Sequence, residues 1–596
     1  MAEDNEGAFA YSLKVDGEEL YADGKTVVVS IDVQKMFDRI PTARIVIHDG
    51  DAAAQDFVLS GADTFKPGAA VELGLGFGTE TSCVFKGFIA SHSIRIRNSG
   101  SPFLVLEAKD TAAFMTSQLR SRYFDEKAKD SDLFDELIKE NAKAVKSKYS
   151  DKLKLAAGTI DDTTVEHDQM VQFNSTDWDF VLQRAHANGL QVIADDGTLS
   201  IADKIKTPDT ENELTIKYGD NLFEMDGEID ATGVYENAEM LTWQTEGEEL
   251  TEEPAATGDV TVTGNTQNTA SDLAAAQGNA TRTIRIGANI PANEAQAFAK
   301  SVVQRSKISG YRGRIRILGN NKIKPGTKVK LEGLGTSFNG ETVATGVSQC
   351  YNEKGWFTDL FFGMAGHLPE LQKLKNTGKD KAMVPRMGGL HVGRVTKVSA
   401  DPNSEFRVQV TMPMIDKEKD GVWAHVAAPD AGKEHGIIFI PDVDDYVVVG
   451  HLDDDPRHPI VLGSFHHKSL EAPLKAADED NYIKGIYTKS GIKLTFDDEN
   501  GIVDLVTPKE QEIKIDDKEG KITITDKKKN VVEMSDSGVA VTSKKDITLT
   551  ADGDITIKGK NVTLEASAAF KAKGTSGANL EASGTTVVKG ATVNIN

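Results

Sequence analysis

The clearest hydrophobic pattern lies near the end of the chain, where pairs of apolar residues recur in short runs. In DITLTADGDITIKGKNVTLEAS, residues 546–567, the two apolar residues of each run stand two positions apart and share one face of an extended segment. This face is predicted to hold the side chains of Ile547, Leu549, Ile555, Ile557, Val562 and Leu564. The pattern therefore predicts three short strands, each with one apolar face.

The same pattern recurs on both sides of this stretch. The further pairs are Ile492 and Leu494, Ile513 and Ile515, Ile522 and Ile524, Val532 and Met534, Val539 and Val541, and Val593 and Ile595. Between the pairs lie turn-forming runs such as DDENG, DDKEG and SDSG. A period of about seven to ten residues indicates a needle of stacked strands over residues 484–596.

The repeat supplies nothing to cover its apolar face, because it contains neither an amphipathic helix pattern nor a second sheet pattern. An open sheet of this length with an apolar face would aggregate. Three copies of the chain, each giving one face of a triangular prism, would bury every pair while each strand pairs with the next rung. We therefore expect a homotrimeric, triple-stranded β-helix. The alternative, a β-solenoid built by one chain, needs coils longer than a rung of about eight residues.

The opening part of the chain alternates polar with apolar or β-branched residues, which predicts strands. The segments within residues 8–110 are KTVVVSIDV, ARIVIHD, AVELGLGF, HSIRIRN and PFLVLEAKD. Gly74, Gly76 and Gly78 invite comparison with a phosphate-binding loop, but their spacing is not GxGxxG and no helix follows at once. We interpret them as a strand bend or turn.

Three amphipathic helices follow the opening strands and are expected to pack on a sheet. Their predicted caps and ends are Ser131 for the first, Thr176 and Gly189 for the second, and Asn293 and Gly310 for the third.

Composition divides the rest of the chain. Residues 244–280 are rich in Glu, Thr, Gly and Asn and poor in large apolar residues, so we interpret them as an acidic, solvated loop. Residues 376–387 are predicted to be a linker and residues 469–483 a connector. Residues 388–468 contain six β-like segments, which predict a small barrel: HVGRVTKV, EFRVQVTM, GVWAHVAAP, HGIIFIP, DYVVVGHL and HPIVLGSF.

Charge and cysteine content exclude several classes of function. Asp and Glu number 92 against 68 Lys and Arg, a net charge of −24, which argues against binding nucleic acid or anionic membranes through phosphate contacts. The start MAEDNEGAFA lacks a signal pattern, and no apolar run is long enough to span a bilayer, so we expect the chain to fold in the cytosol. Cys83 and Cys350, the two cysteines, are predicted to be buried small apolar residues rather than a disulfide framework.

Two kinds of catalytic or metal site deserve comparison with simpler interpretations. Seven of the twelve histidines lie between His391 and His467, but none has helical i, i+4 spacing or a partner cysteine, so no metal or cofactor is predicted. Asp497, Asp498 and Glu499 are compatible with a polysaccharide-acting β-solenoid enzyme that uses paired acids. They lie in repeating turns, where solvated Asp is usual, and HExxH and GxSxG motifs are absent. We therefore do not expect an enzyme, with the polysaccharide-acting enzyme as the alternative.

The barrel segment resembles the OB-fold domain of the VgrG spike proteins of contractile injection systems and of phage tail hub and spike proteins. The resemblance rests on Gly393, Arg394, Met412, Pro413, Trp423, Pro429, Gly432, Pro441, Asp455, Pro456, Pro459, Leu462 and Gly463. The chain departs from the family at Asp444, where Gly is common, and at Met414, where Trp is common. Asp tolerates a left-handed turn, so neither change threatens the fold.

Residues 1–375 resemble the hub domain of the same family, mainly through TDWDFVLQRAHANGLQVIADDGTLSIAD. The resemblance implies a mainly β chain: hub-like β-barrel parts with a few helices, an OB-fold barrel and a trimeric needle. It also implies a homotrimeric spike that caps the inner tube of a baseplate and is driven through a target envelope.

The partners implied by the resemblance are the inner tube and baseplate proteins at the hub end, a PAAR-repeat tip protein at the needle end, and effectors. The tip protein is expected to dock on Val593, Asn594, Ile595 and Asn596. Neither nucleic acid nor stable membrane anchoring is expected.

Overall fold

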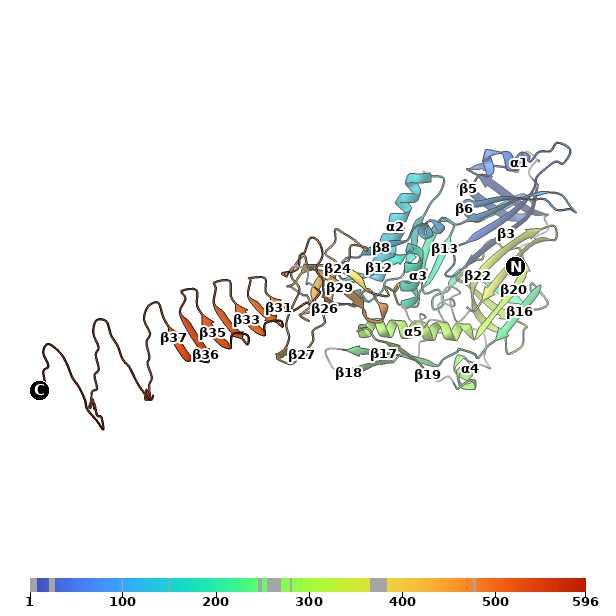
Figure 1. The fold of residues 1–596 in the computed structure, drawn as a ribbon. Coiled ribbons are helices and arrows are strands. Elements are labelled where there is room, and N and C mark those ends of the chain that lie inside the picture. Colours follow the sequence, from blue (N-terminus) through green and yellow to red (C-terminus); the bar gives the residue numbers. More distant parts are fainter. Residues whose placement is uncertain are drawn as a thin grey trace. The chain divides into compact units, whose positions relative to one another are not determined.

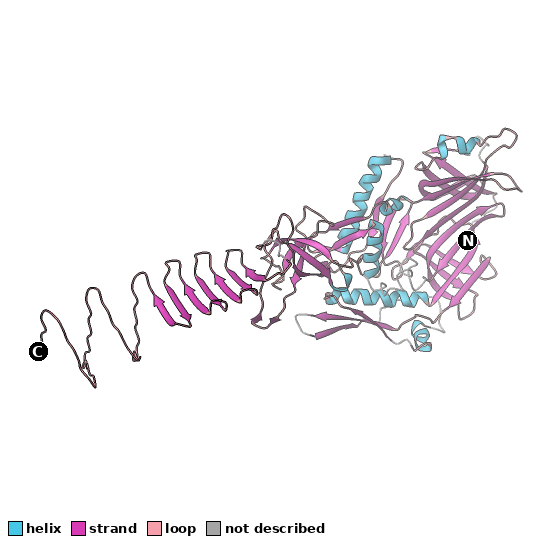
Figure 2. Cartoon of the chain, viewed as in Figure 1, coloured by secondary structure: helices cyan, strands magenta, loops and turns pink. Residues whose placement is uncertain are grey.

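The computed structural model describes residues 8–20, 27–98, 100–149, 151–244, 249–254, 269–278, 281–364, 383–474 and 479–595. By contacts along the chain it divides into two compact units, Met1–Leu470 and Glu471–Asn596. Strands predominate in both units, and the described helices all belong to the first (Figure 2). The prediction of a mainly β chain is therefore confirmed.

The hub, which we define as the described residues up to Met364, is built on one large sheet of thirteen strands (Figure 1). Along the sheet the order is β16-β20-β23-β22-β3-β4-β7-β6-β5-β1-β2. Outside this order, β21 pairs with β22, and β15 pairs with β21. The strands are β1 (Phe9–Val15), β2 (Glu18–Glu19), β3 (Val28–Met36), β4 (Thr42–His48), β5 (Ala70–Phe77), β6 (Glu80–Arg95), β7 (Phe103–Lys109), β15 (Asp209–Lys217), β16 (Glu224–Ile229), β20 (Tyr311–Leu318), β21 (Thr327–Glu332), β22 (Gly340–Asn352) and β23 (Gly355–Phe362).

The predicted glycine triplet lies in the hairpin between β5 and β6. Gly74 and Gly76 belong to β5, and Gly78 turns the chain with a φ of +65°. A Cβ atom on Gly76 would lie 1.9 Å from the carbonyl oxygen of Glu80 on the returning strand. The glycines therefore permit close approach of two strands, as the turn interpretation predicted.

The three predicted helices are present as α2 (Asp130–Tyr149), α3 (Asp177–Ala187) and α5 (Ala292–Ser309). Thr176 caps α3, because its side chain accepts a hydrogen bond from the backbone N–H of Asp179 at 3.0 Å. The prediction that Asn293 caps α5 is wrong: the N-cap residue is Pro291 and Asn293 lies inside the helix. The restricted φ of proline, here −55°, starts this helix earlier than the polar side chain suggested.

Smaller elements complete the hub. The helices are α1 (Val58–Gly61) and α4 (Ala270–Ala276), and the strands are β8 (Arg120–Tyr123), β9 (Ala128–Lys129), β10 (Ala156–Ile160), β11 (Glu166–His167), β12 (Val171–Ser175), β13 (Gln191–Asp195), β14 (Thr198–Ala202), β17 (Asn237–Gln244), β18 (Glu249–Pro254) and β19 (Thr281–Ile286).

The segment predicted as a solvated loop contains regular structure, so that prediction is wrong for its described residues. In β18 the chain pairs with β17 through backbone hydrogen bonds, which do not require apolar side chains. In α4 a capping box between Thr269 and Asp272 begins a helix that buries Leu273 and Ala274. Residues 245–248, 255–268 and 279–280 lie outside the described residues.

The barrel is closed by five strands in the order β24-β25-β26-β30-β29. These are β24 (His391–Lys397), β25 (Val408–Thr411), β26 (Val422–Val426), β29 (Tyr446–His451) and β30 (Pro459–Ser464). Asp444 has a φ of +75°, so it occupies the left-handed turn expected at this position. Of the predicted linker, residues 376–382 lie outside the described residues, as do residues 365–375 before it.

The predicted sixth strand, HGIIFIP, does not enter the barrel. β26 pairs directly with β30 in parallel and closes the barrel without it. The segment instead forms a short hairpin, β27 (Ala431–Gly432) with β28 (His435–Gly436), followed by Ile437–Ile440, which is not a strand.

The second unit begins with a regular antiparallel meander in which each strand pairs with the next. Its strands are β31 (Ile483–Tyr487), β32 (Lys493–Asp497), β33 (Ile502–Val506), β34 (Glu512–Asp516), β35 (Lys521–Thr525), β36 (Val531–Ser535) and β37 (Gly538–Thr542). Beyond β37, residues 543–595 form no strand with any described residue of their own chain, so the prediction of rung-to-rung pairing within one chain is wrong there. We call β31 to Ile595 the needle.

Candidate functional site

The hub and the barrel share part of one apolar core. Tyr123 of β8 and Val171 of β12 are buried among the core residues of the barrel, with Phe173 packed against them. The hydroxyl oxygen of Tyr123 accepts a hydrogen bond from the backbone N–H of Met412 at 2.9 Å. Burial raises the pKa of this hydroxyl to about 12. The two domains therefore meet through a desolvated contact.

Gln169, in the turn between β11 and β12, adds a second link between hub and barrel. Its Oε1 accepts a hydrogen bond from the backbone N–H of Trp423 in β26 at 2.9 Å. Its side-chain amide donates to the carbonyl oxygens of Trp423 and Arg457. One hub side chain thereby satisfies backbone groups on two separate parts of the barrel.

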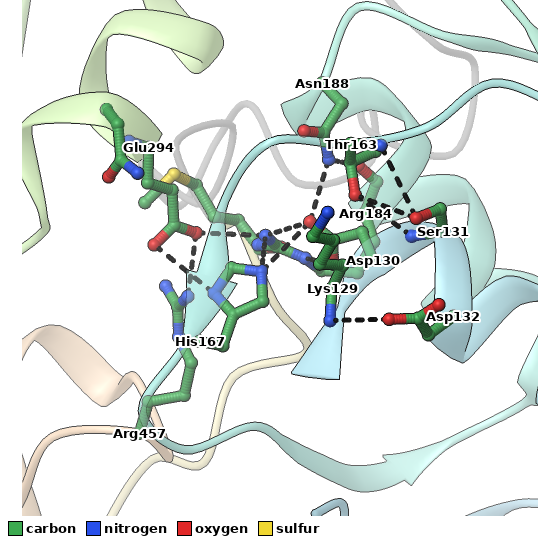
Figure 3. A network of polar contacts seen from close by, with 12 residues as sticks. Lys129, Asp130, Ser131, Asp132, Thr163, His167, Arg184, Asn188, Glu294 and Arg457 are labelled. Carbon is green, nitrogen blue, oxygen red and sulfur yellow. Dashed lines mark hydrogen bonds and ion pairs between the residues drawn. The ribbon is translucent and has the colours of Figure 1, made fainter. Parts of the chain in front are cut away.

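A buried network of charged side chains lies beside this contact (Figure 3). Arg184 of α3 donates two hydrogen bonds to Asp130, the first residue of α2, at 2.7 and 2.8 Å. Its Nη2 also lies 3.0 Å from Oε1 of Glu294 in α5. From the barrel, Arg457 donates to the same Oε1 at 2.7 Å and to Asp455 at 2.8 Å. We call these residues, with His167, the junction network.

Every member of the junction network is largely removed from solvent. Asp130 and Arg184 are 0% exposed, Glu294 2% and Arg457 4%. Burial by itself would raise the pKa values of Asp130 and Glu294, but the neighbouring arginines hold both below their ordinary range. Because the desolvation cost of each charge is met only by its partners, the network requires helices α2, α3 and α5 and the barrel loop to be in place together.

The junction network cannot be predicted from local sequence patterns. Its one sequence signal is Arg184, which follows Val181 by three residues and therefore lies on the predicted apolar stripe of the second helix. A cation on a buried stripe indicates a buried partner. The identity of that partner depends on contacts between distant segments.

The barrel also contains a buried histidine ring outside the junction network. Neither ring nitrogen of His451, at the end of β29, has a partner among the described residues. The ring packs edge-on against His391 with centroids 5.5 Å apart. Burial, and next the proximity of His391, lower the pKa of His451 to about 4, although Asp454 and Asp455 oppose the shift.

The needle carries two uninterrupted rows of apolar side chains on one face of β32–β37. By register, the rows are Leu494, Leu505, Ile513, Ile524, Val532 and Val541, and Phe496, Val503, Ile515, Ile522, Met534 and Val539. The four predicted pairs from Ile513 and Ile515 to Val539 and Val541 therefore share one face. In β32 the pair is Leu494 with Phe496, because Ile492 precedes the strand.

The burial of the needle strands is the reverse of that in a sheet covered by its own chain. In β34, Ile513 and Ile515 are 45% and 41% exposed, whereas Asp516 is only 6% exposed. Asp516 is covered because its carboxylate accepts from the backbone N–H of Glu519 in the turn and pairs with Lys514. The apolar face has no comparable cover among the described residues of the chain.

The structure does not bring the predicted trimer-core residues together within one chain. All six are exposed, from 52% for Val562 to 72% for Leu549; the others are Ile547, Ile555, Ile557 and Leu564. Of the predicted tip residues, Val593 is 47% and Ile595 91% exposed, Asn594 is also exposed, and Asn596 lies outside the described residues. The role of these residues stays a prediction.

In the acidic cluster of Asp497, Asp498 and Glu499, at the turn between β32 and β33, Asp497 has a structural role. Asp497 accepts hydrogen bonds from the backbone N–H groups of Glu499 and Asn500 at 3.0 and 3.1 Å. Within the described ranges, no group of three or more His, Cys, Asp or Glu side chains is placed to hold a metal ion. No helix among these residues has the length and apolar character needed to cross a membrane.

Two family models match this chain. Residues 5–353, more than half of the chain, match the Alg8 N-terminal domain. Residues 391–466 match the type VI secretion system/phage-baseplate injector OB domain.

One curated relative matches a short part of the chain. The type VI secretion system spike protein VgrG3 of Vibrio cholerae serotype O1 (strain ATCC 39315 / El Tor Inaba N16961) is 36% identical over 76 residues, 12% of this chain. The match spans only 8% of the length of that relative.

Solved structures of the Francisella PdpA–VgrG complex are similar over most of the chain. The half-lidded form has a TM-score of 0.51 at 10% identity and covers 90% of this chain and 87% of that chain. The lidded form has a TM-score of 0.50 at 9% identity and covers 90% and 80%. At these identities the likeness is one of fold.

Breaking the junction network should destabilise the first unit. Arg457→Met leaves Glu294 and Asp455 buried without this partner, and we expect a loss of about 3–5 kcal/mol in the free energy of unfolding. The control, Arg312→Met, removes partly exposed ion pairs with Glu228 and Asp230 and should cost about 0–1 kcal/mol. Tryptophan fluorescence during thermal unfolding checks this, because all four tryptophans precede residue 470. Equal shifts for both variants would contradict the prediction.

Acid should weaken the barrel through His451. Because its folded pKa of about 4 lies below the ordinary value of about 6.5, its contribution to stability is present above pH 6.5 and lost as pH falls toward 4. We expect the melting temperature to drop less between pH 7 and pH 5 in His451→Phe than in the wild type. His466→Phe, at an exposed histidine, should keep the wild-type drop; a reduced drop in that control, or an unchanged drop in His451→Phe, would count against this assignment.

Proposed function

We propose, from the premise that this chain belongs to the Alg8 N-terminal domain family and is a VgrG-type spike protein, that three copies form the puncturing spike of a contractile injection system. The chain is a structural protein of the spike and baseplate class that assembles with other tail components. In the proposed assembly the hub caps the inner tube and contacts the baseplate proteins, and the needle is the first part to cross the target envelope.

The observation that carries this proposal is the uncovered apolar face of the needle. Two rows of apolar side chains cross six strands, and in β34 the exposed fractions of Ile513 and Ile515, 45% and 41%, exceed the 6% of Asp516 on the opposite face. Each such side chain contributes about 1.5–3 kcal/mol when removed from water. Two further copies of the same face provide cover without any additional protein, because a three-fold axis presents the same rows from three sides.

The segment after β37 supports the same proposal. Residues 543–595 continue the spacing of apolar pairs, yet have no strand partner among the described residues of their own chain. Extended backbone with unpaired N–H and C=O groups is stabilised when another strand supplies the missing hydrogen bonds. In the proposed trimer the two other copies supply the missing strand partners. The side chains that then face the axis are those of Ile547, Leu549, Ile555, Ile557, Val562 and Leu564.

We propose a mechanical rather than a catalytic role for the chain. The carboxylate of Asp497 accepts hydrogen bonds within the turn between β32 and β33, which supports this choice over a polysaccharide-acting enzyme. We also propose that the chain is made in the cytosol and leaves it only as part of the fired particle, with effectors carried on the spike.

The trimer is tested by the mass of the assembled chain. Light scattering should give about three times the 64.3 kDa of one chain in native buffer. Ile555→Asp should destabilise the trimer strongly, since three carboxylates would meet near the axis, each costing several kcal/mol. The control is Thr556→Asp, one residue along, whose side chain points to the other face and should leave the mass unchanged. A stable wild-type monomer would refute the proposal.

We further propose that a small tip protein of the PAAR-repeat class docks on the end of the needle formed by Val593, Asn594 and Ile595. Exposed apolar side chains and unpaired backbone groups at this position offer the contacts that strand-type recognition uses. Deleting residues 591–596 should abolish recovery of the cognate tip protein in a pull-down while light scattering still reports the trimer. Equal recovery by the full-length and shortened chains would place the tip protein elsewhere.

A further inference from the structure

The barrel carries an exposed arm, which we define as residues 427–440, between β26 and Pro441. Every residue of the arm is exposed. The arm turns through β27 and β28 and ends in four apolar residues, among which Ile438 is 71% and Phe439 65% exposed. Figure 1 shows the arm extending from the barrel strands at β27. Four consecutive apolar side chains on an exposed arm mark a contact surface.

The same barrel carries an apolar patch on its outer surface. Val447, Val449 and Val461 point into the barrel core and are 0% exposed, so the alternating residues of β29 and β30 point outward. The outward residues and their neighbours form the patch: Leu390, Val392, Val448, Ile460 and Leu462. At its centre is Gly450, where an added Cβ would meet the side chains of Leu390, Leu462 and Ile460 at 3.5, 3.6 and 3.8 Å.

The arm and the patch do not cover one another within a single chain. Leu390 is 66% exposed, and Val392 and Leu462 are each 49% exposed, while the arm residues are exposed as well. The barrel therefore has two different uncovered apolar surfaces. A ring with three-fold symmetry is held together by contacts between two different surfaces of adjacent copies, which is the requirement that an arm and a patch on one chain satisfy.

We infer that the arm of one copy packs on the patch of the adjacent copy, so that the three barrels form a closed ring. The inference rests on the proposed trimer, because the needle is what brings three barrels together. Residues 465–482 alone separate β30 from β31, and they span at most about 65 Å when fully extended. Each barrel is thereby held near the others, where Ile438 and Phe439 of one copy reach Leu462 and Val392 of the next.

Cross-linking between differently tagged chains tests the contact. Two full-length chains, both with Cys83→Ser and Cys350→Ser, are co-expressed, one carrying Phe439→Cys and one tag, the other carrying Leu462→Cys and a second tag. Diamide accepts the two electrons and two protons released when a pair of thiols forms a disulfide, which requires Cβ atoms within about 4.5 Å. The control pairs Phe439→Cys with Met414→Cys, a barrel residue that is 79% exposed and lies outside the patch.

We expect a cross-linked product with both tags from the Phe439→Cys and Leu462→Cys pair and none from the control pair. No two-tag product from chains that light scattering shows to be trimeric would overturn the arm contact and leave the trimer standing. A single chain that carries both Phe439→Cys and Leu462→Cys and forms the disulfide only within itself would also overturn it. A monomeric wild type would remove the proposed function and this inference together. If either substitution prevents assembly, Ile438→Cys with Val392→Cys decides by the same criteria.

Discussion

The C-terminal unit depends on one requirement: an apolar strand face must be removed from water. In a sheet that a single chain covers, apolar side chains are buried and polar ones face solvent. In β34 this order is reversed, with Ile513 nearly half exposed and Asp516 buried in its turn. The hub and barrel, in contrast, enclose their apolar side chains in cores of their own chain. The first unit therefore has apolar cores within one chain, whereas the apolar face of β32–β37 is left uncovered by the described residues of its own chain.

The junction between hub and barrel, in contrast, is a contact made entirely by residues of one chain. Packing of Tyr123 and Val171 removes apolar surface from water. The junction network fixes the orientation of the barrel against the hub, because Arg457 must meet Glu294 and Asp455 in one geometry. Buried ion pairs add little net stability compared with apolar packing, but they penalise displaced arrangements heavily.

Sequence reasoning succeeded where local chemistry decides the structure. The strand AVELGLGF, the Thr176 cap and the left-handed turn at Asp444 each follow from the conformational preferences of a few neighbouring residues. The shared face of Ile513 and Ile515 followed from a period of two, which belongs to any strand.

It failed where distant segments decide. Periodicity does not distinguish a buried strand from an exposed apolar arm, so Ile437–Ile440 was assigned to the barrel wall. The sequence of β18 contains few apolar residues and therefore gives no strand signal, although β18 pairs with β17 through the backbone. The partners of Arg184 come from α2 and α5, far apart in sequence, and no local pattern specifies such a meeting.

The meander of β31–β37 also bears on how three chains would find the correct alignment. Each of its hairpins closes a loop of only a few residues, so these strands form quickly and independently of chain concentration. Among the described residues, 543–595 have no such local partner, so in the proposed trimer this segment pairs only after the chains meet. Three preformed meanders would therefore act as a template that sets a common register. Pairing between the chains would then proceed stepwise from β37 toward the C-terminus. Slipped alignments, which a long repeat otherwise invites, would be rejected at the first rung rather than trapped at the last.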